Sequence, residues 1–198
     1  MISALAYTIP LAFASGLNVY ATVAVLGLCS HYGLVALPAQ FRAFDNPIVI
    51  TVALVMYLVE FVADKIPWLD TMWDVVHTVV RPIGGALVAV TALGDASATA
   101  TTLAALLGGS VAMTTHLTKT GTRAAANTSP EPFSNWILSF GEDVLAVSIA
   151  YGALTHPMLA LAIAAALLIV IVAFASVLIR AIRRRFGRVA RRPADQGP

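Results

Sequence analysis

Charged residues are scarce in this chain of 198 residues. Asp, Glu, Lys and Arg together make up 11% of it, whereas about a quarter of an ordinary soluble domain is charged. Only five of the twelve Lys and Arg residues lie before residue 180. Hydrophobic residues reach 59%, and the mean hydropathy is +0.86. A surface so poor in charge would expose large apolar patches to water, so the composition excludes a soluble globular domain and predicts a membrane protein.

Cysteine is almost absent as well. Cys29 is the only one, which excludes an intrachain disulfide and a structural zinc site built on several thiolates. The apolar N-terminal stretch lacks the Lys or Arg residues that precede the core of a signal peptide, so we expect it to be retained.

The longest uncharged run is residues 158–179, which is long enough to cross a hydrocarbon core of roughly 30 Å. Seven arginines follow it, an arrangement that predicts a stop-transfer signal and a cytoplasmic C-terminus. We interpret these arginines as an anchor for anionic lipids rather than a nucleic-acid site. The expected organisation is one membrane-embedded domain over 1–186 and a basic, disordered tail over 187–198.

Hydrophobic runs and breaker residues predict an all-α polytopic bundle of about five to six helical segments, some broken or re-entrant. The first segment should break near Ser15 and Gly16, and the third near Pro82 and the following glycine pair. Ser129-Pro130-Glu131 is typical of a helix start. The expected segments are 3–31, 47–65, 70–93, 98–122, 130–154 and 157–186.

A weak internal repeat relates residues 16–31 to residues 141–156. Five of the sixteen aligned positions are identical, and Asn18 falls opposite Asp143. A chance match is also possible in a chain rich in Ala and Val. A true duplication would favour a transporter, because transporter binding sites often lie where the broken helices of two repeats meet.

Ionisable residues recur at helical spacing within the apolar segments. Glu60 and Asp64 share one face of the second segment, and adjacent Lys65 points away from both, so a group from another helix must neutralise them. The third segment carries a stripe at spacings of 4, 3 and 4, made of Asp70, Asp74, His77 and Arg81. This stripe could face water on a surface-lying helix, but its acids favour a helix that enters a cavity.

The fourth segment supplies a basic face and the fifth an acidic pair near mid-membrane. Intramembrane charges usually face a bundle interior, where they mark a solute pathway or form structural ion pairs. We therefore expect one binding site for a substrate or ion, formed by Asn18, Glu60, Asp64, Lys65, Asp70, Asp74, His77, Arg81, His116, Lys119, Arg123, Glu142 and Asp143.

The sequence predicts no catalytic residue and no cofactor. A divalent metal is a minor possibility, because imidazole and carboxylate ligands suit manganese, iron or zinc. The candidate ligands are Glu60, Asp74, His77, His116 and Glu142, although their spacing is not diagnostic.

Several short motifs resemble the bacterial family called domain of unknown function 4126. The resemblance covers roughly residues 10–155 and implies a multi-pass protein of the bacterial cytoplasmic (inner) membrane, without implying an activity or a ligand. The motifs are the stretches 14–18 and 60–67, Trp73-Asp74, His77-Thr78, Arg81-Pro82, Thr115-His116, Lys119, Arg123 and the stretch 127–132.

Three functions are compatible with these features. The leading hypothesis is a small transporter or channel for an ion or small charged solute, with His77 or His116 as a possible proton-coupling group. In the first alternative, a membrane-embedded enzyme grips a lipid phosphate or pyrophosphate through Lys119 and Arg123. In the second, the protein is a structural subunit of a membrane complex whose charges pair internally. Homo-oligomers are possible, and the sequence does not identify the solute.

Overall fold

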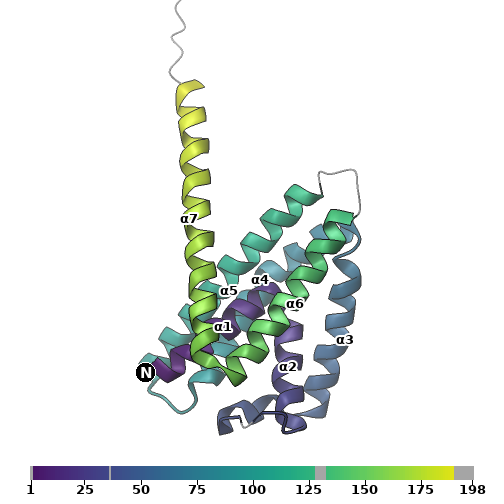
Figure 1. Ribbon diagram of the computed structural model, residues 1–198, viewed down its shortest axis with the longest axis vertical. Helices are drawn as coiled ribbons and strands as arrows, with labels where there is room; N and C mark the ends of the chain where they lie inside the picture. Colours follow the sequence, from purple (N-terminus) through teal and green to yellow (C-terminus); the bar gives the residue numbers. More distant parts are fainter. Residues whose placement is uncertain (1, 36, 128–132, 190–198) are drawn as a thin grey trace, which may run out of the picture.

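The protein is all-helical throughout the residues that the computed structural model describes, which are 2–35, 37–127 and 133–189 (Figure 1). Seven α-helices and one short 3-10 helix form a bundle, in agreement with the predicted class. Their bounds are α1 Ile2–Leu17, α2 Val19–His31, η1 Ala39–Phe44, α3 Pro47–Ala63, α4 Pro67–Leu93, α5 Ala98–Ala126, α6 Phe133–Thr155 and α7 Pro157–Val189.

The first hydrophobic segment is broken, as predicted, but at Asn18 rather than at Ser15 and Gly16. Asn18 has extended backbone angles and caps α2, because its side-chain oxygen accepts a hydrogen bond from the Ala21 amide at 2.9 Å. Gly16 instead allows close packing of α1 on α5, since a Cβ there would lie 2.7 Å from the Thr115 side chain. The break divides α1 from α2 in the middle of the bundle (Figure 1).

Helix α4 is continuous through Pro82, so the prediction of an interruption there was wrong. The glycines after Pro82 serve helix packing instead. A Cβ on Gly85 would meet the Ala112 side chain of α5, and one on Gly108 would lie 2.6 Å from the Gly85 carbonyl oxygen. These contacts hold α4 and α5 at close backbone distance, and packing of this kind stabilises helix pairs in lipid.

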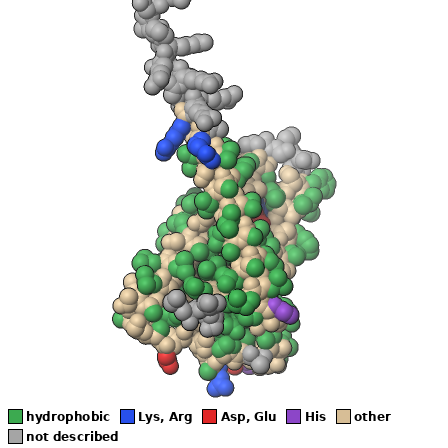
Figure 2. Space-filling view, turned by 60° about the vertical axis from the view of Figure 1, so that its left-hand side comes forward, with side chains coloured by type: hydrophobic (Ala, Val, Ile, Leu, Met, Phe, Trp, Pro, Cys, Tyr) green, Lys and Arg blue, Asp and Glu red, His purple; other side chains and the backbone are tan. Residues whose placement is uncertain are grey.

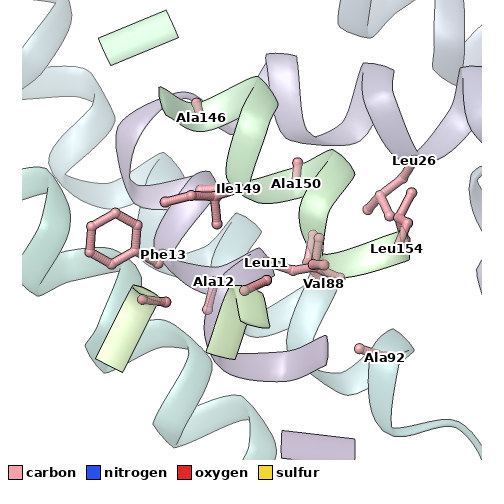
Figure 3. Packing of buried hydrophobic residues seen from close by; sticks show 14 of the residues in the cluster. Leu11, Ala12, Phe13, Leu26, Val88, Ala92, Ala146, Ile149, Ala150 and Leu154 are labelled. Carbon is pink, nitrogen blue, oxygen red and sulfur yellow. The ribbon is translucent and has the colours of Figure 1, made fainter. Parts of the chain in front are cut away.

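Polar and apolar side chains occupy different halves of the long helices. Buried residues in the first half of α4 and α6 are mostly polar, and those in the second half are apolar; α5 has the reverse order. Because α5 runs antiparallel to α4 and α6 (Figure 1), the polar halves meet at one end of the bundle. The other half is a core packed from α1, α2, α4 and α6, including Phe13, Leu26, Val88, Ile149 and Leu154 (Figure 3).

Three helical stretches among the described residues are long and apolar enough to cross a membrane: Trp68–Leu93, Phe133–Thr155 and Pro157–Arg180. Hydrophobic side chains are spread over the face of the bundle shown in Figure 2, with few charged side chains among them, as expected for a surface in contact with lipid. Helix α7 extends beyond the bundle toward the same end as the polar half (Figure 1). Arg180, in the later part of α7, is exposed.

The predicted boundaries are otherwise close to the observed ones. Helix α7 continues to Val189, past the expected start of the tail at residue 187, whereas residues 190–198 lie outside the described part of the chain. The predicted helix start at Ser129-Pro130-Glu131 also lies outside it. The 3-10 helix was not predicted; it places Phe41 in the core.

The close contact of α4 with α5 leads to a prediction about two glycines of α5. Gly108→Ala should destabilise the protein by about 1–3 kcal/mol, because the added methyl meets backbone that cannot move aside. Gly121→Ala is the matched control, since nothing lies within 4 Å of its Cβ position and alanine favours the helix by about 0.5–1 kcal/mol. Unfolding of both variants in detergent micelles measures the difference, and equal stabilities would contradict the packing argument.

Candidate functional site

The charged stripe of α4 faces the interior of the bundle. Asp70, Asp74, His77 and Arg81 are each at most 2% exposed, whereas residues on the opposite face, such as Val75, are more than half exposed. In a soluble protein, an amphipathic helix turns its charged face to water, whereas here the charged face is buried. The observed orientation contradicts the alternative in which the stripe faces water. It fits a helix whose apolar face contacts lipid.

Lys119 is at the centre of a buried ion-pair network. Its ammonium lies 2.8 Å from Asp64, 3.3 Å from Glu60 and 3.6 Å from Glu142, and its side chain is fully buried. It therefore neutralises the two acids of α3 that required a partner from another helix. Through Lys119, α5 is joined to α3 and α6.

Arg123, one turn further along α5, forms the outer part of the same network. Its guanidinium donates to Asp64 at 2.9 Å and to Glu142 at 2.7 Å, and it lies 3.4 Å from Asp70. It also donates to the Asn135 side chain at 3.0 Å and to the Asp64 backbone carbonyl at 2.7 Å. Arg123 thus connects the ends of α3 and α5 with the beginnings of α4 and α6.

Arg81 and the helix break form the inner part of the network. Arg81 donates to Glu60 at 2.6 Å and to the carbonyl oxygen of Gly16 at 3.1 Å. Lys119 donates to the carbonyl oxygen of Leu17 at 3.4 Å. Both oxygens belong to the last turn of α1, where the helix dipole is negative and favours a nearby cation. The break at Asn18 therefore provides backbone acceptors at the depth of the network.

The two histidines differ in their hydrogen bonds. Arg81 donates to Nδ1 of His116 at 2.9 Å, so this nitrogen has no proton, and Nε2 of His116 lies 3.1 Å from the Thr78 hydroxyl. A proton on Nδ1 would break the bond from Arg81 and face its positive charge. His77 donates from Nδ1 to the Trp73 carbonyl at 2.8 Å, and its Nε2 lies 3.2 Å from the Tyr20 hydroxyl, which can donate to it or accept from it.

Three acidic or basic side chains of the predicted site, the histidines aside, lie near the network without forming an ion pair among the described residues. Asp74 is 2% exposed and its Oδ1 has no hydrogen-bond partner. Asp143 accepts from the Asn18 amide at 2.9 Å through Oδ1, and its Oδ2 has no partner. Lys65 donates to the Phe61 carbonyl at 2.9 Å and to the Ser139 hydroxyl at 3.4 Å.

The contact of Asn18 with Asp143 joins the two residues that the sequence repeat aligns. The duplication itself stays a prediction.

Carboxylates outnumber cations in this part of the bundle. Three buried cations, Arg81, Lys119 and Arg123, face six acids, and counting Lys65 still leaves a surplus of two negative charges. Unpaired charge is costly where water is excluded. The six acids are Glu60, Asp64, Asp70, Asp74, Glu142 and Asp143.

The side chains expected to line a polar cavity are instead packed at hydrogen-bonding distance. A groove of about 500 Å³ lies between α3 and α4, but only apolar residues and Trp73 line it, Val59 and Val62 among them. The described residues contain no group of three or more His, Cys, Asp or Glu side chains that could hold a metal ion. The candidate metal ligands are therefore not assembled there as one ligand set.

Some polar groups of the site were absent from the predicted set. Asn135 and Ser139 lie four residues apart on the face of α6 that carries Asp143, and extending the spacing argument backwards from Asp143 would have found them. No sequence signal identifies Tyr20 or the carbonyl groups of α1, because their roles depend on where the first segment breaks.

Comparison with known protein families identifies the family of this chain. Residues 5–177 match the family described as domain of unknown function (DUF4126), and the chain belongs to that family. The match extends beyond the range that the motifs indicated and includes most of α7. The comparisons with curated proteins and with solved structures found no match.

The position of Lys119 leads to a prediction about stability. Lys119→Met keeps the length of the side chain but removes its charge, leaving Glu60 and Asp64 short of a partner. We expect a loss of about 3–5 kcal/mol in the free energy of unfolding. The control is Asp45→Asn, which removes a partner from the exposed pair with His31 at 2.8 Å and should change stability by less than about 1 kcal/mol. Unfolding in micelles compares the free energies of unfolding of the two variants. Equal losses would contradict the expectation that the buried ion pairs stabilise the protein more than the exposed pair does.

Proposed function

We propose that this protein is a small membrane transporter for an ion or small charged solute, with the buried charge network as its binding site. The observation that carries this proposal is the surplus of carboxylates over cations in the network, where five of the six acids are buried and Glu142 is partly exposed. A purely structural network gains nothing from unpaired negative charge, whereas a binding site for a positively charged solute requires it. The surplus therefore favours a cation as the solute.

The arrangement of the two halves supports a transporter over a channel. The polar half extends from one end of the bundle to the helix break, and the apolar core with Phe13, Val88 and Ile149 occupies the other half (Figure 3). An ion in the network would meet tightly packed side chains on its way onward. Movement across the membrane would require these helices to rearrange, as in alternating access around a site at a broken helix.

The enzyme alternative receives less support. Lys119 and Arg123, the groups that would grip a phosphate, are already surrounded by Asp64 and Glu142. An anionic substrate would have to displace these carboxylates and enter a region with excess negative charge. The structural-subunit alternative fits the dense pairing around Lys119 but not the unpaired oxygens of Asp74 and Asp143.

The test is ion flux in proteoliposomes. Wild-type protein should carry a cation across the vesicle membrane, and Glu60→Gln, Asp74→Asn and Glu142→Gln should each lower the rate at least about tenfold, since one negative charge of the site is lost. Asp95→Asn, at an exposed loop residue between α4 and α5, is the matched control and should keep the wild-type rate. Wild-type vesicles without flux of any cation, or three variants at full rate, would refute the proposal.

We infer further that the C-terminus lies in the cytoplasm of a bacterial cell, which places the polar half toward that side. The supporting features are the exposed Arg180 and Arg183 in the last part of α7. Helix α7 projects beyond the bundle at the end where the polar half lies (Figure 1). The same arginines would contact anionic lipids. A green fluorescent protein fused to the C-terminus should fluoresce in an inner-membrane fraction, and alkaline phosphatase fused there should be inactive. The opposite pair of results would reverse the orientation.

A further inference from the structure

Several acids of the network have one buried oxygen without a partner, but only Asp74 and Asp143 also form no ion pair among the described residues. Asp143 lies ten residues after the beginning of α6, about 15 Å along the helix and thus near the middle of a 30 Å hydrocarbon core. It is 4% exposed, and its only hydrogen bond among the described residues is the one that Oδ1 accepts from Asn18 at 2.9 Å. The second oxygen, Oδ2, is buried without a partner.

The elements packed around Asp143 supply few cations to neutralise it. Helix α7 has no charged residue between 158 and 179, and Tyr20 of α2 is directed to His77. Lys119 of α5 is already bound by Glu60 and Asp64. The polar and titratable groups of the surrounding elements are Asn18 at the helix break, Tyr20 of α2, Tyr57, Glu60, Asp64 and Lys65 of α3, Lys119 of α5 and Glu142 of α6 itself.

Lys65 is the one cation in this neighbourhood of the described chain that is not bound to a carboxylate. Its ammonium lies 3.0 Å from the centre of the Phe61 ring and 3.4 Å from the Ser139 hydroxyl. Ser139 precedes Asp143 by four residues, so both side chains lie on the same face of α6, one turn apart. Lys65 also donates to the Phe61 backbone carbonyl at 2.9 Å, so only neutral groups hold it, one helical turn from a carboxylate that forms no ion pair.

We propose that Asp143 carries a proton on Oδ2 when Lys65 rests on Ser139, and that Lys65 moves to Asp143 when this proton leaves. A proton fits the position better than a metal ion, because neutralising one buried carboxyl oxygen with a proton needs no further ligands. In the exchange the proton passes to water that reaches the site, and the lysine ammonium takes its place beside the carboxylate. While Asp143 holds the proton, the charged acids of the network exceed the cations by one rather than two. The role of this exchange as the coupling step of transport rests on the proposed function.

The exchange assigns proton coupling to Asp143 rather than to His116. His116 cannot accept a proton on Nδ1 without losing the hydrogen bond from Arg81. Asp143 can release its proton without losing the bond from Asn18, since the amide donates to either form of the carboxyl group. A buried carboxyl group next to a helix break is also placed where a rearrangement of α1 and α2 would change its access to water.

Infrared difference spectroscopy of the full-length protein in lipid vesicles tests the proposal without any transported solute. Wild-type protein at neutral pH should show the C=O stretch of a protonated carboxyl group, sensitive to deuterium exchange. Asp143→Asn should remove this band and Asp143→Glu should shift it, whereas Asp95→Asn should leave it unchanged. If Asp143→Asn does not fold, the shift of the C=O band in Asp143→Glu is the test of whether Asp143 carries the proton. A wild-type protein without the band, or a band that neither variant alters, would overturn the proposal.

The pH dependence of the same band tests the role of Lys65. Lys65→Gln removes the ammonium that would replace the proton, so the band of Asp143 should persist to a higher pH than in wild type. A lysine with a merely structural role would leave this pH dependence unchanged, and that result would overturn the exchange.

The proposal of transport and the proposal of a protonated Asp143 can be refuted independently. A band that depends on Asp143 in vesicles without flux would keep the protonated carboxyl group and refute transport. Flux in a protein without the band would keep transport and refute the role of Asp143.

Discussion

The free energy needed to bury charge away from water is the constraint on which the rest of this structure depends. Each buried cation satisfies it by contacting several acceptors at once: Arg123 alone joins Asp64, Asp70, Glu142 and Asn135. Removing one partner leaves the others with charge that the surroundings do not solvate. The ends of α3 and α5, the beginnings of α4 and α6 and the break between α1 and α2 are therefore positioned together.

The division of the bundle into a polar and an apolar half follows from the same constraint. Polar side chains gathered at one end can satisfy each other, whereas the same groups scattered through the apolar core would each need a separate partner. The apolar half contains many small residues, and close backbone contact, as between Gly85 and Gly108, replaces ion pairs as the source of stability. The network reaches inward as far as the break at Asn18, where the last carbonyl groups of α1 become available as acceptors.

Much of the candidate site could be predicted because lipid reverses the usual meaning of an amphipathic helix. The spacing of Asp70, Asp74, His77 and Arg81 defines one face of a helix, and in an apolar solvent that face must turn inward. The same argument gave α5 a basic face and required a partner from another helix for the acids of α3, which Lys119 provides. It did not distinguish paired residues from unpaired ones: Lys65 is next to Asp64 in sequence and contacts Phe61 and Ser139 instead.

The sequence by itself determined the helical class and the four groups of residues that supply the charge, because these follow from hydropathy and helical periodicity. It favoured the inward orientation of the charged faces without deciding it. Only the tertiary structure decided which charges pair, that α4 continues through Pro82, that the first segment breaks at Asn18, and that Asp143 has an oxygen without a partner. Periodicity fixes the face on which a side chain lies, but partners on different helices depend on packing distances to within an ångström, and local sequence does not contain them.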